Sequence, residues 1–429
     1  MARKMKDSGI EWIGEIPEGW RTINPKALFT QRKDKAQKGE RQLTSSQQHG
    51  ILYQDEYMEL TGSKVVTVEK DFDILKHVEA GDFVISMRSF QGGLEYSTKS
   101  GAISSAYVML VPNLELVYPR FYRWLLKSSV YIDALQRTTN MVRDGQAMRY
   151  SNFAQVRLFT LPLDEQKSRA DFLDVKCSSI DKMLSKTRSS IEEYKKLKQA
   201  VITQAVTKGV RGEREMKDSG VEWIGEIPKE WGRTKIKMIA SFFNGDRTSR
   251  YPQPSDFVDV GVAFLTSRNI DNDEVDLSET KYITDEKYKS LSGAKIQIDD
   301  IIFCLRGSVG KCAINRTLSC GTVASSLATI RPKDIYPKYL LYFLLSNIAS
   351  TQTTIFMNGT CAANLSAENV GNYYITLPSS AEQKEIADCL DAKCAEIDKL
   401  IAKKEQLVKE LESYKKSLIY EVVTGKREV

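Results

Sequence analysis

Residues 5–17 read Met-Lys-Asp-Ser-Gly-Ile-Glu-Trp-Ile-Gly-Glu-Ile-Pro, and the same stretch returns at residues 216–228 with Val221 in place of Ile10. We call these two stretches the opening motifs. A second repeat pairs residues 166–207 with residues 383–424. Because a long internal repeat determines architecture, the sequence predicts two similar halves. Each half has an opening motif, a variable block and a charged segment.

The two variable blocks share little sequence but keep a common skeleton. Residues 81–88 align with residues 299–306, and Tyr118-Pro119 aligns with Tyr336-Pro337. Short runs of β-branched and aromatic residues predict strands, and a proline at the start favours a helix. We therefore expect mixed α/β blocks, with strands at 83–87, 106–111 and 301–305 and helices at 120–136 and 338–350.

The charged segments have the pattern of long helices that pair through a heptad seam. Alternate steps of four and three residues give ten positions in each segment, of which eight are apolar. Two such stripes predict a coiled coil, whereas a solvated linker helix would not need them. Near-equivalent halves suit a pseudo-twofold axis, which predicts antiparallel helices. The seam positions are Leu173, Cys177, Ile180, Leu184, Thr187, Ile191, Tyr194, Lys198, Val201 and Ala205, and Leu390, Cys394, Ile397, Ile401, Lys404, Val408, Leu411, Lys415, Leu418 and Val422.

The ends of these helices are also marked in the sequence. Both begin after Leu-Pro, the second with the capping-box spacing Ser380-x-x-Gln383, and both end near a glycine, Gly209 or Gly425. The predicted fold is α/β (α+β), with two globular domains separated by two long antiparallel coiled-coil helices. The predicted segments are 1–160, 161–215, 216–376 and 377–429.

The composition excludes several classes of protein. No apolar run approaches the roughly 20 residues of a membrane span, and the N-terminus lacks the apolar core of a signal peptide, so we expect a cytoplasmic protein. Seven cysteines without a CxxC pair and only two histidines, His49 and His77, give no zinc pattern. Residues 307–312 resemble a phosphate loop but lack the Walker A spacing and its Ser or Thr. We therefore expect no metal or cofactor in this chain.

Predicted loops in both blocks carry side chains suited to nucleic acid. The net charge is +6, and the basic excess lies mainly in the two blocks. Arg pairs with guanine, and Asn or Gln with adenine. Each loop alone could be an ordinary solvated loop, but their recurrence in both halves favours a DNA interface. The candidate residues are Arg88, Gln91, Arg143, Gln146 and Arg149 in the first block, and Arg268, Asn269, Arg306, Lys311, Asn358, Thr360 and Asn364 in the second.

These motifs together resemble the specificity subunit of type I restriction-modification systems, over essentially the whole chain. The resemblance rests on the doubled opening motif, the variable blocks, and the Leu-Pro helices carrying Glu-Gln-Lys and Ile-Asp-Lys. It implies two target recognition domains, each reading half of a split, non-palindromic site in double-stranded DNA. It also implies two modification subunits that use S-adenosylmethionine and, through them, restriction subunits that use ATP and Mg²⁺. The chain itself would be non-catalytic.

Two questions stay open at the level of sequence. Trp12, Ile16, Trp223 and Ile227 of the opening motifs either dock the modification subunits or seal each block onto the helices. The rival classes of protein are a self-contained DNA enzyme and a DNA-independent coiled-coil scaffold. Methyl transfer by the purified chain would identify the first, and absence of sequence-selective binding would identify the second.

Overall fold

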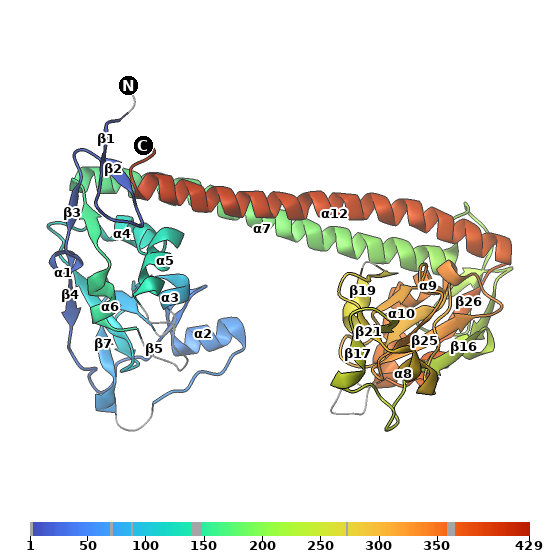
Figure 1. The fold of residues 1–429 in the computed structure, drawn as a ribbon. Coiled ribbons are helices and arrows are strands. Elements are labelled where there is room, and N and C mark those ends of the chain that lie inside the picture. The colour runs from blue at the N-terminus through green and yellow to red at the C-terminus, as the bar shows by residue number, and fades with distance from the viewer. Residues whose placement is uncertain (1–2, 69–71, 87–88, 139–147, 272, 358–364) are drawn as a thin grey trace. The chain divides into compact units, whose positions relative to one another are not determined.

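The computed structural model describes residues 3–68, 72–86, 89–138, 148–271, 273–357 and 365–429. The chain forms two compact units, which we describe separately (Figure 1). Unit 1 comprises Met1–Arg188 and Gln406–Val429, and unit 2 comprises Ser189–Glu405. Among the described residues, no helix is both long and apolar enough to cross a membrane.

Each unit begins with a hairpin made by its opening motif. In unit 1, β1 (Met5–Asp7) pairs antiparallel with β2 (Glu15–Pro17), and in unit 2, β13 (Met216–Asp218) pairs with β14 (Glu226–Pro228) in the same register. The turn closes tightly because Ile10 O accepts hydrogen bonds from the backbone N–H groups of Ile13 and Gly14. Gly14 and Gly225 adopt positive φ there, a conformation that favours glycine.

Unit 1 is built around a four-stranded antiparallel sheet in the order β4-β11-β8-β9. Its strands are β4 (Phe29–Arg32), β11 (Val108–Pro112), β8 (Phe83–Ile85) and β9 (Glu95–Tyr96). The pairs β3 (Arg21–Ile23) with β12 (Leu158–Thr160), β5 (Leu43–Ser46) with β6 (Gly50–Tyr53), and β7 (Lys76–Val78) with β10 (Gly101–Ile103) complete its strands. Its shorter helices are α1 (Pro25–Leu28), α2 (Gln54–Thr61), α3 (Ser89–Gly92), α4 (Pro119–Leu125), α5 (Ser129–Arg137) and α6 (Tyr150–Gln155).

Unit 2 repeats this plan with a larger sheet in the order β16-β25-β22-β23-β20-β19. The strands are β16 (Ala240–Asn244), β25 (Leu327–Pro332), β22 (Ile301–Cys304), β23 (Cys312–Ile314), β20 (Glu274–Val275) and β19 (Ile270–Asp271). A second sheet orders β17 (Phe257–Val258), β21 (Lys281–Ile283), β18 (Val262–Leu265) and β24 (Gly321–Val323), and β15 (Gly232–Lys235) pairs with β26 (Tyr374–Leu377). The shorter helices are α8 (Asp285–Ser290), α9 (Pro337–Leu345), α10 (Asn347–Met357) and α11 (Ala367–Gly371).

Two long helices, α7 (Leu163–Lys208) and α12 (Ser380–Val423), contribute to both units. In unit 1, Asp181 and Arg188 of α7 contact Lys415 and Glu412 of α12, and in unit 2, Lys198 contacts Asp398. Because the partner number falls as the α7 number rises, the helices run antiparallel, which confirms the predicted direction. All the predicted seam positions are buried or half-buried. The seam therefore joins the two helices as the heptad pattern indicates.

Three local predictions need correction. The predicted helices 120–136 and 338–350 are each two helices, because the chain turns at Ser128 and Ser346. Their hydroxyls donate to Leu125 O and Phe343 O, 2.7 and 2.6 Å away, and so bond the end of the preceding helix. The strands at 83–87, 106–111 and 301–305 are present as β8, β11 and β22, although Met87 lies outside the described residues. The predicted capping box of Ser380 is wrong, because Ser379 Oγ accepts from the N–H of Glu382.

Candidate nucleic-acid interface and partner surface

The structure describes six of the twelve predicted DNA-contact residues. Gln91 lies on α3, and Arg149 directly precedes α6. Arg268 lies on a short turn before β19, and Arg306 and Lys311 lie in the connection between β22 and β23. All five are exposed. The residues outside the described part of the chain are Arg88, Arg143, Gln146, Asn358, Thr360 and Asn364.

In unit 2, a backbone hydrogen bond links two residues that are far apart in the chain. Leu305 O accepts a hydrogen bond of 3.0 Å from Leu365 N. Arg306 directly follows the first of these residues, and the predicted contact Asn364 directly precedes the second. The fold therefore brings Leu365 beside the start of the 306–311 connection, although 60 positions separate Leu305 from Leu365 in the chain.

Asn269 does not fit the predicted contact with DNA. Its side chain is buried, and its amide donates to Asp276 O and to Thr280 Oγ1, each at 3.0 Å. Its Oδ1 accepts from the Thr266 N–H at 2.8 Å. The amide is thus fully used inside unit 2, so Asn269 braces the turn that carries Arg268 and is not a direct reader of bases.

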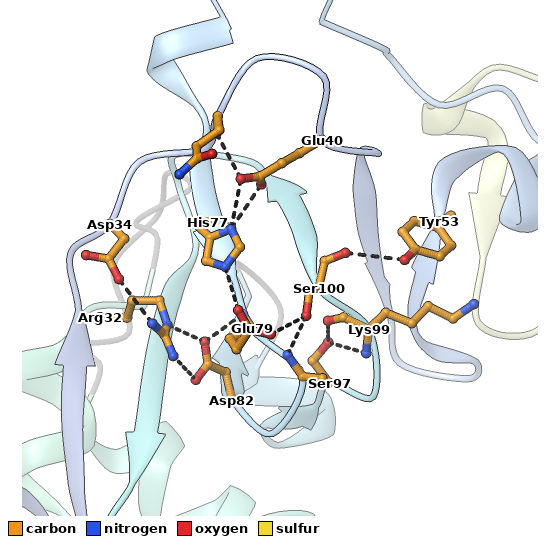
Figure 2. A network of polar contacts seen from close by, with 12 residues as sticks. Arg32, Asp34, Glu40, Tyr53, His77, Glu79, Asp82, Ser97, Lys99 and Ser100 are labelled. Carbon is orange, nitrogen blue, oxygen red and sulfur yellow. Dashed lines mark hydrogen bonds and ion pairs between the residues drawn. The ribbon is translucent and has the colours of Figure 1, made fainter.

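Sequence reasoning missed a buried carboxylate directly before a central strand of each unit. In unit 1, Asp82 accepts from Arg32 Nε and Nη2 at 2.6 and 3.0 Å, and in unit 2, Asp300 accepts from Arg331 at 2.8 Å (Figure 2 shows the first pair). The two carboxylates occupy equivalent positions, but their arginine partners come from strands that do not correspond. Arg32 is on the edge strand β4 in unit 1, and Arg331 is on the inner strand β25 in unit 2. A signal was present, since the two aspartates align in the repeat.

Unit 1 also holds a histidine between two carboxylates (Figure 2). His77 Nδ1 lies 3.0 Å from Glu40, and Nε2 lies 3.0 Å from Glu79. Burial lowers the pKa of His77, but the hydrogen bonds to Glu79 and Glu40 outweigh it and raise the pKa above its ordinary value. Hydrogen bonds from Ser100 and His77 lower the pKa of Glu79 to about 2. The arrangement favours a charged imidazole that ties β7 to the loop carrying Glu40.

The opening motifs seal each block onto the helices. Ile16 and Ile227 are fully buried, and Ile10, Ile13 and Trp20 share a core with Leu418 and Val422 of α12. This burial contradicts direct docking of a partner through Ile16 and Ile227 and supports the sealing alternative. Trp12 and Trp223 are half-buried; Trp12 Nε1 donates to Arg157 O at 3.2 Å, whereas Trp223 Nε1 has no hydrogen-bond acceptor among the described residues.

The repeated Glu-Gln pair at the start of each helix anchors this seal. Trp20 Nε1 donates to Glu165, and Trp231 Nε1 donates to Glu382, at 3.1 and 2.9 Å. The next residue, Gln166 or Gln383, accepts from the backbone N–H of Tyr118 or Tyr336, respectively, at 2.7 and 2.8 Å. These contacts explain why both helices carry a Glu-Gln pair near their start. In each unit the glutamate binds the tryptophan that follows the opening motif, and the glutamine binds the tyrosine of the Tyr-Pro pair in the variable block.

Within each unit, the paired helices carry charged residues on one side of the seam and some exposed apolar residues on the other. Positions directly after the seam residues carry Asp181, Arg188, Lys195, Asp398, Glu405 and Glu412. The variable block of each unit contacts the helices on this side. Seven positions before Asp181 and Asp398 lie Asp174, which binds Arg120, Arg123 and Trp124, and Asp391, which binds Lys338 and Tyr342.

The other side of the helices leaves apolar side chains exposed at the positions directly before the seam residues. In an antiparallel pair these positions of both helices face the same side. We call these five residues the apolar stripe: Met183, Leu407 and Tyr414 in unit 1, and Leu197 and Leu400 in unit 2. They are 36% to 50% exposed. In each unit these side chains leave exposed apolar surface on the long helices.

Comparisons with known proteins agree with this architecture. Residues 228–410 match the family model of the type I restriction modification DNA specificity domain. The type I restriction enzyme MjaVIII specificity subunit of Methanocaldococcus jannaschii is 24% identical over 358 residues, which cover 81% of this chain and 80% of that protein. The type I restriction enzyme EcoBI specificity subunit of Escherichia coli is 27% identical over 265 residues, which cover 60% of this chain and 55% of that protein.

A solved structure shares the fold over nearly the whole chain. It comes from work on complex assembly and conformational transition of the type I R-M system, with 13% identity, a TM-score of 0.70, and coverage of 96% of this chain and 99% of that one. Two similar α/β units, each of which includes part of both long helices, define a protein built by tandem repetition. The family match and these relatives show that the chain is similar to the specificity subunits of type I restriction-modification systems.

Proposed function

We propose that this chain reads a split, asymmetric site in double-stranded DNA, one half with each unit. The observation that carries the proposal is that the same strand skeleton supports different exposed loops in the two units. Arg149 and Gln91 are presented by unit 1, and Arg268, Arg306 and Lys311 by unit 2. Two dissimilar readers on one scaffold suit a non-palindromic site.

The apolar stripe supplies the docking surface for two modification subunits in this proposal. Its side chains lie opposite the charged side on which the blocks attach, so a partner bound there would leave the block attachments intact. Restriction subunits would join through these partners. Methyl transfer with S-adenosylmethionine and DNA cleavage with ATP and Mg²⁺ would be activities of the partners, and this chain would be non-catalytic.

The reading role is tested by single substitutions in the complex with modification subunits. Arg306→Ala is expected to relax one half-site only, and Arg149→Ala the other half-site only. Loss of a bidentate base contact costs about 1–3 kcal/mol at one base position, whereas loss of a phosphate contact reduces the salt slope by about one. Mapping of methylated sites and binding at several salt concentrations give the answer.

The purified chain alone provides the control. It is expected to transfer no methyl group from S-adenosylmethionine to DNA, and methylation is expected only after a modification subunit is added. Methyl transfer by the isolated chain would favour a self-contained enzyme. Substitution effects that fall on both half-sites at once would contradict separate readers.

A further inference from the structure

An open hollow in unit 2 lies where strand β16 ends. Its volume is about 370 Å³, and it lies between residues 242–248 and residues 292–294. The first segment reads Phe-Phe-Asn-Gly-Asp-Arg-Thr. Asn244 and Arg247 are exposed beside the hollow, and neither was among the DNA contacts predicted from sequence.

The walls of this hollow are held rigidly. Asp246 is buried and accepts four hydrogen bonds of 2.6 to 3.1 Å, two from Thr248 and two from Ser292. A side chain at Gly245 would collide with Ala324 O, and one at Gly293 would collide with Asp246 N. Because both glycines permit close approach of the two backbones, these contacts fix the backbone that carries Asn244 and Arg247 before any ligand arrives.

The groups around the hollow combine an aromatic surface with unpaired polar groups. Phe243 is 38% exposed, and the Arg331 guanidinium lies 4.8 Å from its ring centre. Asp300 fixes that guanidinium through two hydrogen bonds of 2.8 Å. Arg247 donates only through Nε, to Ser325 O at 3.3 Å, so its two terminal nitrogens have no partner among the described residues.

This set of groups matches the major-groove edge of a purine. A guanidinium with two free nitrogens bonds guanine O6 and N7, a primary amide bonds adenine N6 and N7, and an apolar surface accepts the thymine methyl of an adjacent pair. We propose that the hollow formed by Phe243, Asn244 and Arg247 binds purine edges in the half-site read by unit 2. The proposal rests on the function proposed above and assigns a specific reading site to it.

The equivalent place in unit 1 has different chemistry. Phe29 of β4 faces Pro112 and Ala240 of β16 faces Pro332, so Arg32 occupies in unit 1 the position that Phe243 occupies in unit 2. Arg32 is tied to Asp82 and Asp34 and is not free to bind a base. The described residues of unit 1 therefore do not repeat this site, and the two half-sites should differ in the bases read at this place.

The test compares Asn244→Ala and Arg247→Ala with Arg233→Ala in the complex of the full chain with its modification subunits. Arg233 is a matched control because it is an exposed arginine of unit 2 that bonds Gly220 O on the opening motif. Each test variant should weaken binding to the cognate site about 5- to 100-fold and make one or two positions of one half-site degenerate. The other half-site, the salt slope and the control should not change.

Several results would overturn the proposal while leaving the proposed function intact. They are unchanged methylated sites in both variants, or a uniform loss of affinity with a salt slope reduced by about one, which indicates a phosphate contact only. Arg247→Lys keeps the charge without the fork, so it should relax the same position if Arg247 reads a base, and unaltered specificity would count against that role. A wild-type complex that methylates no split site would instead refute the proposed function itself.

Discussion

At the scale of single residues, the two buried aspartates show how one fold tolerates different sequences. Asp82 and Asp300 receive the same backbone bond, from Glu79 N and Gln297 N, each at the start of a tight turn. Their arginine partners lie on different strands: Arg331 is on β25, which pairs with β22, whereas Arg32 is on β4, which is separated from β8 by β11. Alignment of the repeat predicts the aspartates, but the partners depend on cross-strand register, which a single sequence does not reveal.

Removal of one arginine should expose the cost of leaving such a carboxylate unpaired. Arg32→Leu is expected to lower the free energy of unfolding of unit 1 by about 2–4 kcal/mol, because Asp82 stays buried without its partner. Asp34→Ala removes a partner of Arg32 that is 65% exposed and should change it by less than about 1 kcal/mol. Urea unfolding of the full chain measures both, and equal effects would contradict the importance of burial.

The His77 cluster should make the stability of unit 1 depend on pH. The folded pKa of His77 lies above its unfolded value of 6.5, so its contribution is fully present below about pH 6.5. That contribution is lost as pH rises through the raised folded pKa. The urea midpoint of the His77→Gln variant should therefore depend less on pH than that of the wild type between pH 6 and about 8.5. A steeper loss of stability in the variant than in the wild type would refute this assignment.

At the scale of elements, the seam predicts the helices well because its heptad period extends over most of each helix. The short helices are less predictable: nothing in the pattern around Ser128 or Ser346 distinguishes a continuous helix from two helices, since the break depends on packing against the sheet. The contact between the opening motif and the helices also depends on packing between distant segments, so the local pattern does not predict it. Ile16 lies in a short hairpin, and it is buried in a core to which α12, from the far end of the chain, also contributes.

Substitutions of two leucines in α12 should distinguish the seam, which stabilises the fold, from the apolar stripe, which is proposed to bind partners. Leu418 lies in the core of unit 1, and Leu418→Ala should cost about 2–5 kcal/mol. Leu407 is 43% exposed, so Leu407→Ala should change stability by less than about 0.5 kcal/mol. If the stripe binds partners, Leu407→Asp should weaken assembly with modification subunits in size-exclusion chromatography without altering the urea midpoint. Normal assembly of the Leu407→Asp variant would show that the modification subunits do not dock on the apolar stripe at this residue.

At the scale of the whole molecule, the repeat predicts two readers and one pair of helices that supplies part of both. The sequence indicates which loops carry candidate contacts, but it does not indicate which side chains in them contact bases. Direct readout depends on the side chains that face a base and on loops built from distant segments. Arg247 illustrates the limit. Its neighbours at the hollow, Ser292 and Ser325, lie far along the chain, so no local pattern around residue 247 indicates a site.

The paired helices should also set the distance between the two half-sites. One extra heptad after Arg188 in α7 and another after Glu405 in α12 would keep the seam in phase and lengthen each helix by about 10 Å, at 1.5 Å per residue. At about 3.4 Å per base pair, the spacer should grow by roughly three base pairs, with unchanged half-sites, once protein and DNA absorb the accompanying rotation.

Out-of-phase insertions of three or four residues at the same places provide the matched control. They would rotate Ile191 and Val408 out of the seam, so folding or assembly should fail before any change of spacer is seen. Methylated-site mapping of the paired-heptad variant decides between the outcomes. An active complex with its original spacer would show that the distance is fixed by the partners, because the helices would have lengthened without moving the half-sites apart.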